Sequence, residues 1–221
     1  MTKRLGAMVV AMAVIGAAGP VSAQVGLAAR ASTLGVGGEL SYRASKYIGL
    51  RVGANFFSTT RNTTIEGINY DIKPKLENAS AILDLHPLGS AFHLSGGVIR
   101  NSNKGSVVAL LADSITLGPR TYSKDVIGTL TGLIDYKTKY VPYAGLGFSG
   151  RGRLSFLFDL GVVFSGYPQA SLLGTTTLTG QEKQIFEQNV QTEVDQVQAD
   201  IQKHSVLKYY PVVSLGLRFG F

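Results

Sequence analysis

One glycine pattern in the sequence could in principle hold a nucleotide. Gly145-Leu146-Gly147-Phe148-Ser149-Gly150 matches the dinucleotide-binding fingerprint G-x-G-x-x-G. In such a site a helix begins directly after the glycines, and its N-terminus receives the pyrophosphate. Here the next residues, from Arg153 to Phe156, alternate polar and apolar side chains as a β-strand does. We therefore interpret the glycines as part of a strand and expect no nucleotide cofactor.

The three histidines are the other candidates for catalysis or metal binding. The pattern predicts His86 in a turn, His93 near the end of a strand and His204 at the end of a helix, so we expect them not to converge. The sequence contains no H-x-x-x-H pair and no cysteine, which excludes a disulfide and a thiolate metal site. We expect no catalytic residue and no metal, although a triad made by geometry alone would leave an enzyme possible.

The elements that would position any site are strands. Residues 48 to 56 and 154 to 164 have apolar side chains on one face and mostly small, polar or charged side chains on the other. Noisier alternation occupies about 34 to 43, 75 to 85, 91 to 101, 127 to 137, 141 to 149, 168 to 178 and 208 to 221. The mature chain has no apolar run long enough for a membrane helix. A chain of this kind can span a membrane only with strands.

Both ends of the chain point to export. Lys3 and Arg4 precede an apolar run, and Val21-Ser22-Ala23 resembles a signal-peptide cleavage site. The sequence thus predicts a signal peptide over 1–23, Sec-type export with cleavage near Ala23, and a barrel domain over 24–221. The last ten residues alternate up to the terminal Phe221, as the closing strand of an outer-membrane barrel does.

These patterns predict an all-β fold, an antiparallel transmembrane β-barrel with an even number of strands. Ten strands is the first expectation, with 25 to 32 as the first strand. Eight is the second, with part of 102 to 137 as a hairpin outside the membrane. Thr179 and Glu182 form a capping-box pattern, and apolar residues at helical spacing follow, so one amphipathic helix is predicted over about 181–203.

Charged residues fall on the polar face of several predicted strands, where they would share one lumen with the small residues Gly145 and Gly147. They are Glu39, Arg51, Asp84, Asp135, Asp159 and Arg218. Side chains fill the interior of a small barrel, and opposite charges there can satisfy one another. Two basic and four acidic groups predict a plugging ion-pair network with a possible negative excess. The alternative is a narrow channel or porin for small polar or cationic solutes.

Connection lengths predict the sidedness of the barrel. The turns at Ala44, Leu88, Tyr140 and Gly166 are short, so we expect them in the periplasm; the long connections at Asn62, Pro119 and Gln191, including the helix, are expected outside. Basic residues predicted in or beside the external loops could pair with lipopolysaccharide phosphates. They are Arg61, Lys104, Arg120, Lys124, Arg151 and Arg153. No stacking platform accompanies them, so nucleic acid is not an expected partner.

Four stretches resemble small outer-membrane β-barrel proteins of the OmpA/OmpW-like kind. They are Leu83 to Gly89, Phe92 to Gly97, Pro142 to Gly147 and Tyr210 to Gly216. Ser214 to Phe221 is also similar to the signal read by the barrel-assembly machinery, with Gly216, Phe219 and Phe221 at the matching positions. The resemblance implies the outer membrane of a Gram-negative bacterium, outer-membrane lipid as surroundings, and that machinery and periplasmic chaperones as partners during biogenesis. It implies little about activity, and a structural or interaction role is expected, with a lipid-modifying enzyme as a further alternative.

Overall fold

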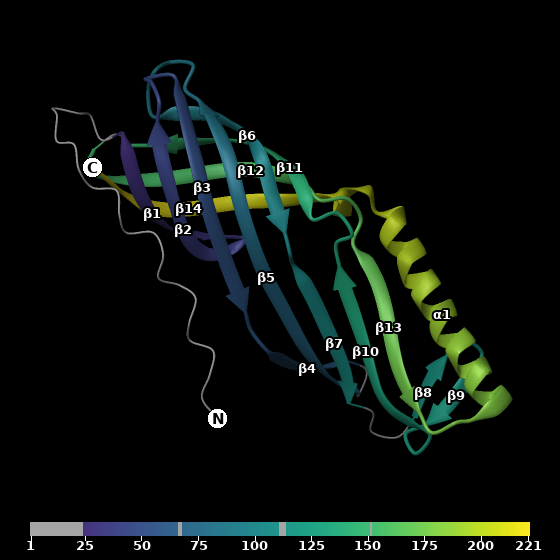
Figure 1. Ribbon diagram of the computed structural model, residues 1–221. Helices are drawn as coiled ribbons and strands as arrows, with labels where there is room; N and C mark the ends of the chain where they lie inside the picture. The colour runs from purple at the N-terminus through teal and green to yellow at the C-terminus, as the bar shows by residue number, and fades with distance from the viewer. Residues whose placement is uncertain (1–23, 66–67, 111–113, 151) are drawn as a thin grey trace.

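The computed structural model describes residues 24–65, 68–110, 114–150 and 152–221. Its main sheet is antiparallel throughout and divides into a closed barrel and a flat extension that leaves the barrel at one end (Figure 1). The signal peptide predicted over 1–23 lies outside the described residues. No helix among the described residues is long and apolar enough to cross a membrane.

Eight strands close the barrel. They are β1 (Val25–Ser32), β2 (Gly35–Arg43), β3 (Ile48–Ser58), β5 (Ile68–Leu85), β6 (Phe92–Asn101), β11 (Tyr140–Ser149), β12 (Leu154–Phe164) and β14 (Tyr209–Gly220). The first strand pairs with the C-terminal half of the last strand, from Gly26 opposite Gly220 to Ser32 opposite Ser214. The pairing of β5 with β6 closes the circle, so no barrel strand has a free edge within the barrel.

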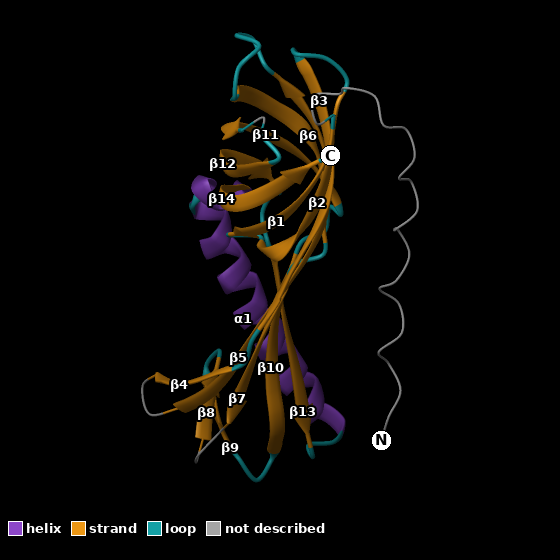
Figure 2. Ribbon diagram, turned by 90° about the vertical axis from the view of Figure 1, so that its left-hand side faces the viewer, coloured by secondary structure: helices purple, strands orange, loops and turns teal. Residues whose placement is uncertain are grey.

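The extension grows from β5, which has 18 residues and is long enough to serve both parts. Its second half belongs to the barrel, whereas its first half pairs with β4 (Arg61–Ile65) and β7 (Lys104–Leu110). Next to β7 lie β10 (Ile127–Asp135) and then β13 (Gln169–Thr176). A separate hairpin, β8 (Ser114–Leu117) and β9 (Arg120–Ser123), and the helix α1 (Gly180–Lys203) complete the extension, and a short 3-10 turn over Ser205–Lys208 leads back to β14 (Figure 2).

The expectation of eight strands is confirmed, and that of ten is wrong. Part of 102 to 137 forms the β8–β9 hairpin, which lies outside the barrel. The segments around 127 to 137 and 168 to 178 do form strands, but β10 and β13 pair with each other and with β7 in the extension. The alternation of a strand predicts the face of the sheet to which each side chain points, but it does not predict which strand lies next to that strand. These two segments therefore resembled barrel strands. The strand predicted over 25 to 32 exists, because Gly35 adopts a φ of 112° that allows a tight turn after Thr33.

The corrected strand number changes the predicted sidedness. With β10 and β13 outside the barrel, the turns at Tyr140 and Gly166 lie at the extension end, with Asn62, Pro119 and Gln191. The turn at Gly150 lies at the opposite end, because Leu154 pairs with Phe219 near the C-terminus. The turns at Ala44 and Leu88 are also at this C-terminal end of the barrel, as β2–β3 and β5–β6 pairing requires. The prediction that Tyr140 and Gly166 share a side with Ala44 and Leu88 is therefore wrong.

The helix α1 lies where the predicted range of 181–203 placed it, but the predicted capping box does not form. Thr179 is the N-cap without a side-chain hydrogen bond, and Glu182 instead pairs with Arg120 of the hairpin at 2.9 Å. Phe186, which is 1% exposed, packs edge-on against Tyr122. The helix thus covers β13 and the hairpin of the extension and does not cap the barrel mouth (Figure 2).

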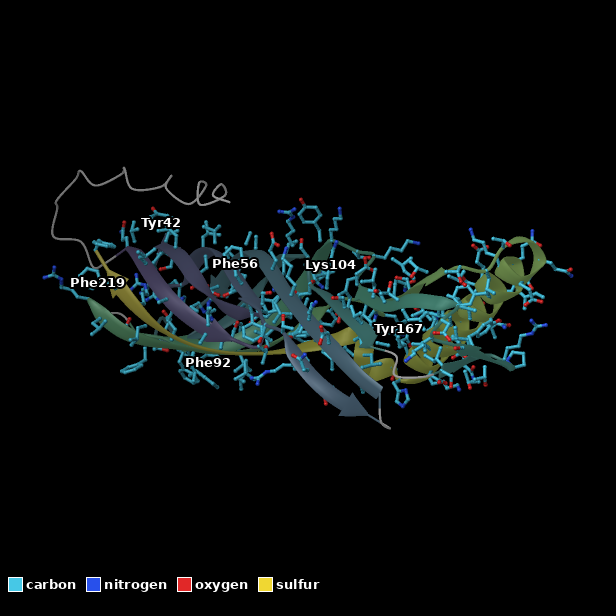
Figure 3. All side chains as sticks on the ribbon, turned by 90° about the horizontal axis from the view of Figure 1, so that it is seen from below. Tyr42, Phe56, Phe92, Lys104, Tyr167 and Phe219 are labelled. Carbon is cyan, nitrogen blue, oxygen red and sulfur yellow. The ribbon has the colours of Figure 1, made fainter. Side chains whose placement is uncertain are left out.

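The outer surface of the barrel is an apolar band. Side chains that point away from the lumen are mostly aliphatic or aromatic, and many are 40% exposed or more. Exposed aromatic residues border this band at both ends: Tyr42, Tyr47, Phe148, Phe156, Phe219 and Phe221 at the C-terminal end, and Phe56, Phe57, Tyr140, Phe164 and Tyr209 at the extension end. Tyr42, Phe56 and Phe219 are labelled in Figure 3. Two aromatic girdles around an apolar band are typical of a barrel that spans a bilayer.

Candidate functional site: the charged lumen

Arg51 is the centre of the lumen. Its side chain projects inward from β3 and is 5% exposed, and three carboxylates surround it. Its Nε lies 2.6 Å from Asp84 Oδ2, its Nη2 lies 3.1 Å from Asp159 Oδ1, and its Nη1 lies 3.4 Å from Glu39 Oε2. Ser95 Oγ accepts from Arg51 and donates to Asp84, which ties the cluster to β6. The alternation of four strands therefore brings these predicted residues together.

A second arginine, Arg30 of β1, completes the cluster and was missed from the sequence. It forms ion pairs with Glu39 and with Asp159, and it donates to Ser214 Oγ at 3.0 Å. The sequence does contain a pattern that predicts this position. Arg30 alternates with the outward residues of β1, as Arg51 does with the outward residues of β3. The alternation test that identified Arg51 would have found it.

Asp135 was predicted in the lumen and is not there. It ends β10 of the extension, is exposed, and lies opposite Lys104 in the β7–β10 register. The error follows from the strand number, since β10 is not a barrel strand. With Asp135 removed and Arg30 added, the described lumen holds the arginines Arg30, Arg51 and Arg218 against the carboxylates Glu39, Asp84 and Asp159. The expected negative excess disappears, and with it the argument for a cation-preferring lumen.

Arg218 lies inside the barrel as predicted, 6% exposed, but nearer the C-terminal end than the Arg51 cluster. Its Nε donates to Ser41 Oγ at 3.0 Å. Across the β1–β14 seam it lies opposite Ala28, and a Cβ on Gly26 would come within 2.2 Å of its guanidinium. The side chain thus fills the space that a small residue of the first strand leaves open.

The glycines of the G-x-G-x-x-G pattern make room for lumen side chains. A Cβ on Gly145 would lie 2.5 Å from the hydroxyl of Tyr143, which is buried above the ion pairs. A Cβ on Gly147 would lie 2.6 Å from Asp159 Oδ1 and 2.8 Å from His93 Nε2. The pattern is followed by a turn and β12, not by a helix, so it has the context of a barrel strand.

Two of the histidines do meet, contrary to expectation. The rings of His86 and His93 are 5.3 Å apart at the C-terminal end of the lumen, and His93 Nε2 lies 2.9 Å from Asp159 Oδ1. The prediction failed because the 86–91 turn folds His86 back over the strand that carries His93. His204, by contrast, is exposed after α1 in the extension.

The ring nitrogens of both buried histidines already have partners. The Nδ1–H of His86 faces the carbonyl oxygens of Ser90 and Phe92 at 3.1 Å, and Arg43 approaches its Nε2 at 3.3 Å. His93 lies between the Ala91 carbonyl and Asp159. Within the described chain, no group of three or more side chains has the composition of a metal site.

An apolar layer lies between the ion pairs and the extension end of the lumen. Its members are Leu34, Ile82, Ile99, Val141, Tyr143, Val163 and Val212, all buried. Between this layer and the arginines a cavity of about 30 Å³ remains, lined on one side by Arg30, Glu39 and Arg51 and on the other by residues of the apolar layer. That volume has room for about one or two water molecules.

The basic residues predicted to contact lipopolysaccharide separate into two groups. Arg61, Lys104, Arg120 and Lys124 belong to the extension. Arg153 instead lies at the C-terminal end of the barrel, over the ring of Phe219 at 5.8 Å, so it does not share a side with the other four, contrary to the prediction. Arg151 lies outside the described residues. Arg153 lies at this end because β10 and β13 do not cross the barrel, which reverses the direction predicted for the strands around it.

The predicted assembly residues lie along β14. Phe219 and Phe221 point outward, with ring centroids 5.1 Å apart, and the Phe221 amide donates to the Val25 carbonyl at 2.9 Å. Gly216 points inward beside Arg30, where a Cβ would lie 3.0 Å from the arginine Cγ. The last residues of the chain therefore form both the seam of the barrel and part of its aromatic girdle.

The His86 turn predicts a dependence of stability on pH. Burial and the nearby Arg43 guanidinium lower the pKa of His86 below its ordinary 6.5. The unfolded chain therefore binds the proton more tightly, so the stabilisation is complete above about pH 6.5 and is lost as the pH falls below it. We expect the midpoint of unfolding in detergent to drop less between pH 7 and 5 in His86→Asn than in the parent. His204→Asn is the exposed control, and equal slopes in all three proteins would contradict the assignment.

Comparison with known proteins places the fold. No protein-family model matches the chain, and no curated protein matches it. Among solved structures, Acinetobacter baumannii CarO2 matches with a TM-score of 0.61 and 22% identity, over 89% of this chain and 98% of that one. CarO of the same organism matches with a TM-score of 0.60 and 22% identity, over 90% and 98%. The chain therefore shares the β-barrel fold of the CarO proteins, in agreement with the small outer-membrane barrel that the sequence resembles.

Proposed function

We propose that the protein is an outer-membrane β-barrel with a closed lumen, which holds its extension at the cell surface in a structural or interaction role. The observation that carries the closed lumen is the Arg51 cluster. Two arginines and three carboxylates from β1, β2, β3, β5 and β12 meet across the interior, each with 10% exposure or less. Ion pairs that join five strands across the lumen oppose any widening of it.

Packing next to the cluster supports the same proposal. A solute that crossed the barrel would have to displace both the ion pairs and the apolar layer of Leu34, Val141 and Tyr143. Breaking buried ion pairs leaves charges without partners, which costs several kcal/mol for each pair. The cavity between the two layers, about 30 Å³, is too small for a nutrient-sized solute.

The location in the outer membrane is supported by the apolar band, the two girdles and the CarO fold, together with the predicted export signal. The barrel-assembly machinery and periplasmic chaperones are then the partners during biogenesis, and lipopolysaccharide is the surrounding lipid. We further propose that the protein is not an enzyme. The support is that the nitrogens of His86 and His93 are engaged by backbone carbonyls, Arg43 and Asp159, so neither ring is poised beside a nucleophile.

Cysteine labelling in intact cells tests the location and the orientation together. Because the natural chain has no cysteine, single substitutions report cleanly. The C-terminus of such barrels lies in the periplasm, so an impermeant maleimide should label cysteines introduced at Tyr140 and Gln191 and spare those at Ala44 and Leu88. Each spared position should react after the outer membrane is permeabilised. Labelling of Ala44→Cys and Leu88→Cys with protection of the other two would reverse the barrel and place the extension in the periplasm.

The second candidate function is a narrow channel for small polar solutes. The observation in its favour is the cavity beside Arg30 and Arg51, which has room for water within an otherwise filled lumen. A channel would require this cavity to extend past Tyr143, whose ring fills the space above Gly145 and Gly161. Recording of conductance separates the two functions, because a closed barrel carries no ions and a channel does.

A further inference from the structure

A second cavity lies outside the lumen, where the extension leaves the barrel. Its volume is about 430 Å³, which falls in the range of ligand-binding pockets, roughly 300 to 1,000 Å³. It is formed where β5 passes from barrel to extension and where β6 ends, β7 begins and β10 turns into β11. We call it the rim pocket. Figure 3 shows one of its residues, Lys104, between the barrel residues Tyr42 and Phe56 and the extension.

The charged lining of the rim pocket is mainly basic: Lys75, Arg100, Lys104 and Lys139 against Glu77 and Asp135. Lys75 is paired with Glu77 at 3.1 Å. Within the described residues, Arg100, Lys104 and Lys139 form no ion pair and donate no side-chain hydrogen bond, and all three are exposed. Three cations that converge on a cavity without protein partners favour an anionic ligand.

The position of the rim pocket along the barrel axis, relative to the apolar band, indicates the source of that anion. On the outward face of β6, Leu94 and Val98 belong to the apolar band, and Arg100 is the next outward residue toward the extension. Arg100 lies opposite Tyr140, a residue of the aromatic girdle, and opposite Ala79, which is two residues from Glu77. The basic side chains therefore begin at the level where the apolar band ends. In a bilayer this level holds the lipid headgroups.

We propose that the rim pocket binds the phosphate groups of an anionic glycolipid of the outer leaflet, with lipopolysaccharide as the lipid of that chemistry in this membrane. Arg100 supplies a planar fork of donors that matches two phosphate oxygens, and Lys104 and Lys139 supply point charges beside it. Glu77 pairs with Lys75, and Asp135 is the other acid of the lining, so four basic and two acidic residues leave the rim pocket with a net positive charge. This proposal rests on the proposed orientation, because the extension end must face the outer leaflet.

Equilibrium binding of fluorescent lipopolysaccharide to the refolded protein in detergent tests the proposal. We expect the triple variant Arg100→Gln, Lys104→Gln and Lys139→Gln to bind at least about tenfold more weakly than the parent. A matched control removes three exposed charges away from the rim pocket, Lys46, Lys183 and Lys203, by the same substitution to Gln, and should bind like the parent. Reversing the basic residue types, as Arg100→Lys with Lys104→Arg and Lys139→Arg, should restore most of the binding, which excludes misfolding as the cause.

Two further arms identify the ligand source. Phosphatase-treated lipopolysaccharide should bind the parent as weakly as the intact lipid binds the triple variant, and inorganic phosphate should fail to compete. Equal affinity of parent and triple variant, or of phosphorylated and treated lipid, would overturn the proposal. Full competition by inorganic phosphate would overturn the lipid assignment. These measurements use purified protein, so their failure would leave the labelling pattern and the closed lumen untouched.

Discussion

Replacing Arg51 by alanine is expected to lower the free energy of unfolding by about 3 to 5 kcal/mol, because the change leaves buried carboxylates without their partner. Asp84 would lose both of its contacts with the guanidinium, at 2.6 and 2.8 Å. Glu39 would keep only Arg30, and Asp159 would keep Arg30 and His93. Unfolding in detergent, followed by urea titration or by the temperature at which the compact form disappears from gels, measures the effect.

The matched control is another arginine in an ion pair at the surface. Arg120 pairs with Glu182 at 2.9 Å, but the two side chains are 46% and 58% exposed. Arg120→Ala should therefore cost at most about 1 kcal/mol. If Arg51→Ala and Arg120→Ala unfold alike, the carboxylates around Arg51 are hydrated and the lumen is open to water.

Deletion of Phe221 together with Phe219→Ala is expected to block assembly while export continues. The two rings are 42% and 60% exposed on the outer face of β14, so they add little to a folded core. They do, however, form the end of the strand that closes the barrel against Val25. Most of the processed double variant should accumulate in the periplasm, as fractionation of cells would detect.

Phe164→Ala provides the comparison for this double variant. Phe164 is likewise outward and 44% exposed, with a T-shaped contact to Tyr209, but it lies at the extension end. Its removal takes away the same ring as Phe219→Ala does, without touching the C-terminus, so assembly should be normal. Loss of assembly in both variants to the same degree would mean that apolar area matters and the terminal position does not.

The faces of the strands could be predicted from the sequence, because a side-chain period of two is a local property. This alternation correctly predicted that Arg51 and Asp159 share one lumen, although 108 positions separate them in the chain. The pairing of strands could not be predicted in this way, since a neighbour in a sheet is a long-range choice. The wrong position predicted for Asp135 is the consequence. Its strand, β10, alternates like a barrel strand but pairs with β7 and β13 of the extension.

The long connections were also misinterpreted, because their structure depends on contacts between residues far apart in the sequence. The stretch from 102 to 126 resembles a loop, but it contains β7 and the β8–β9 hairpin, which are stabilised by contact with α1. Gly118 donates its amide to Glu193 of the helix at 2.8 Å, and Asn189 donates to the Tyr122 hydroxyl at 2.8 Å. These contacts join positions about 70 residues apart, so a local sequence pattern does not predict them.

The most direct test of the closed lumen is single-channel recording of the refolded protein in a planar bilayer. The ion pairs of Arg30 and Arg51 and the apolar layer beside them predict that the membrane stays silent, with no conductance steps above the bare lipid. Insertion must be verified in the same preparation by protease protection of reconstituted vesicles. Regular, reproducible conductance steps from inserted protein would contradict the closed barrel and establish the channel instead.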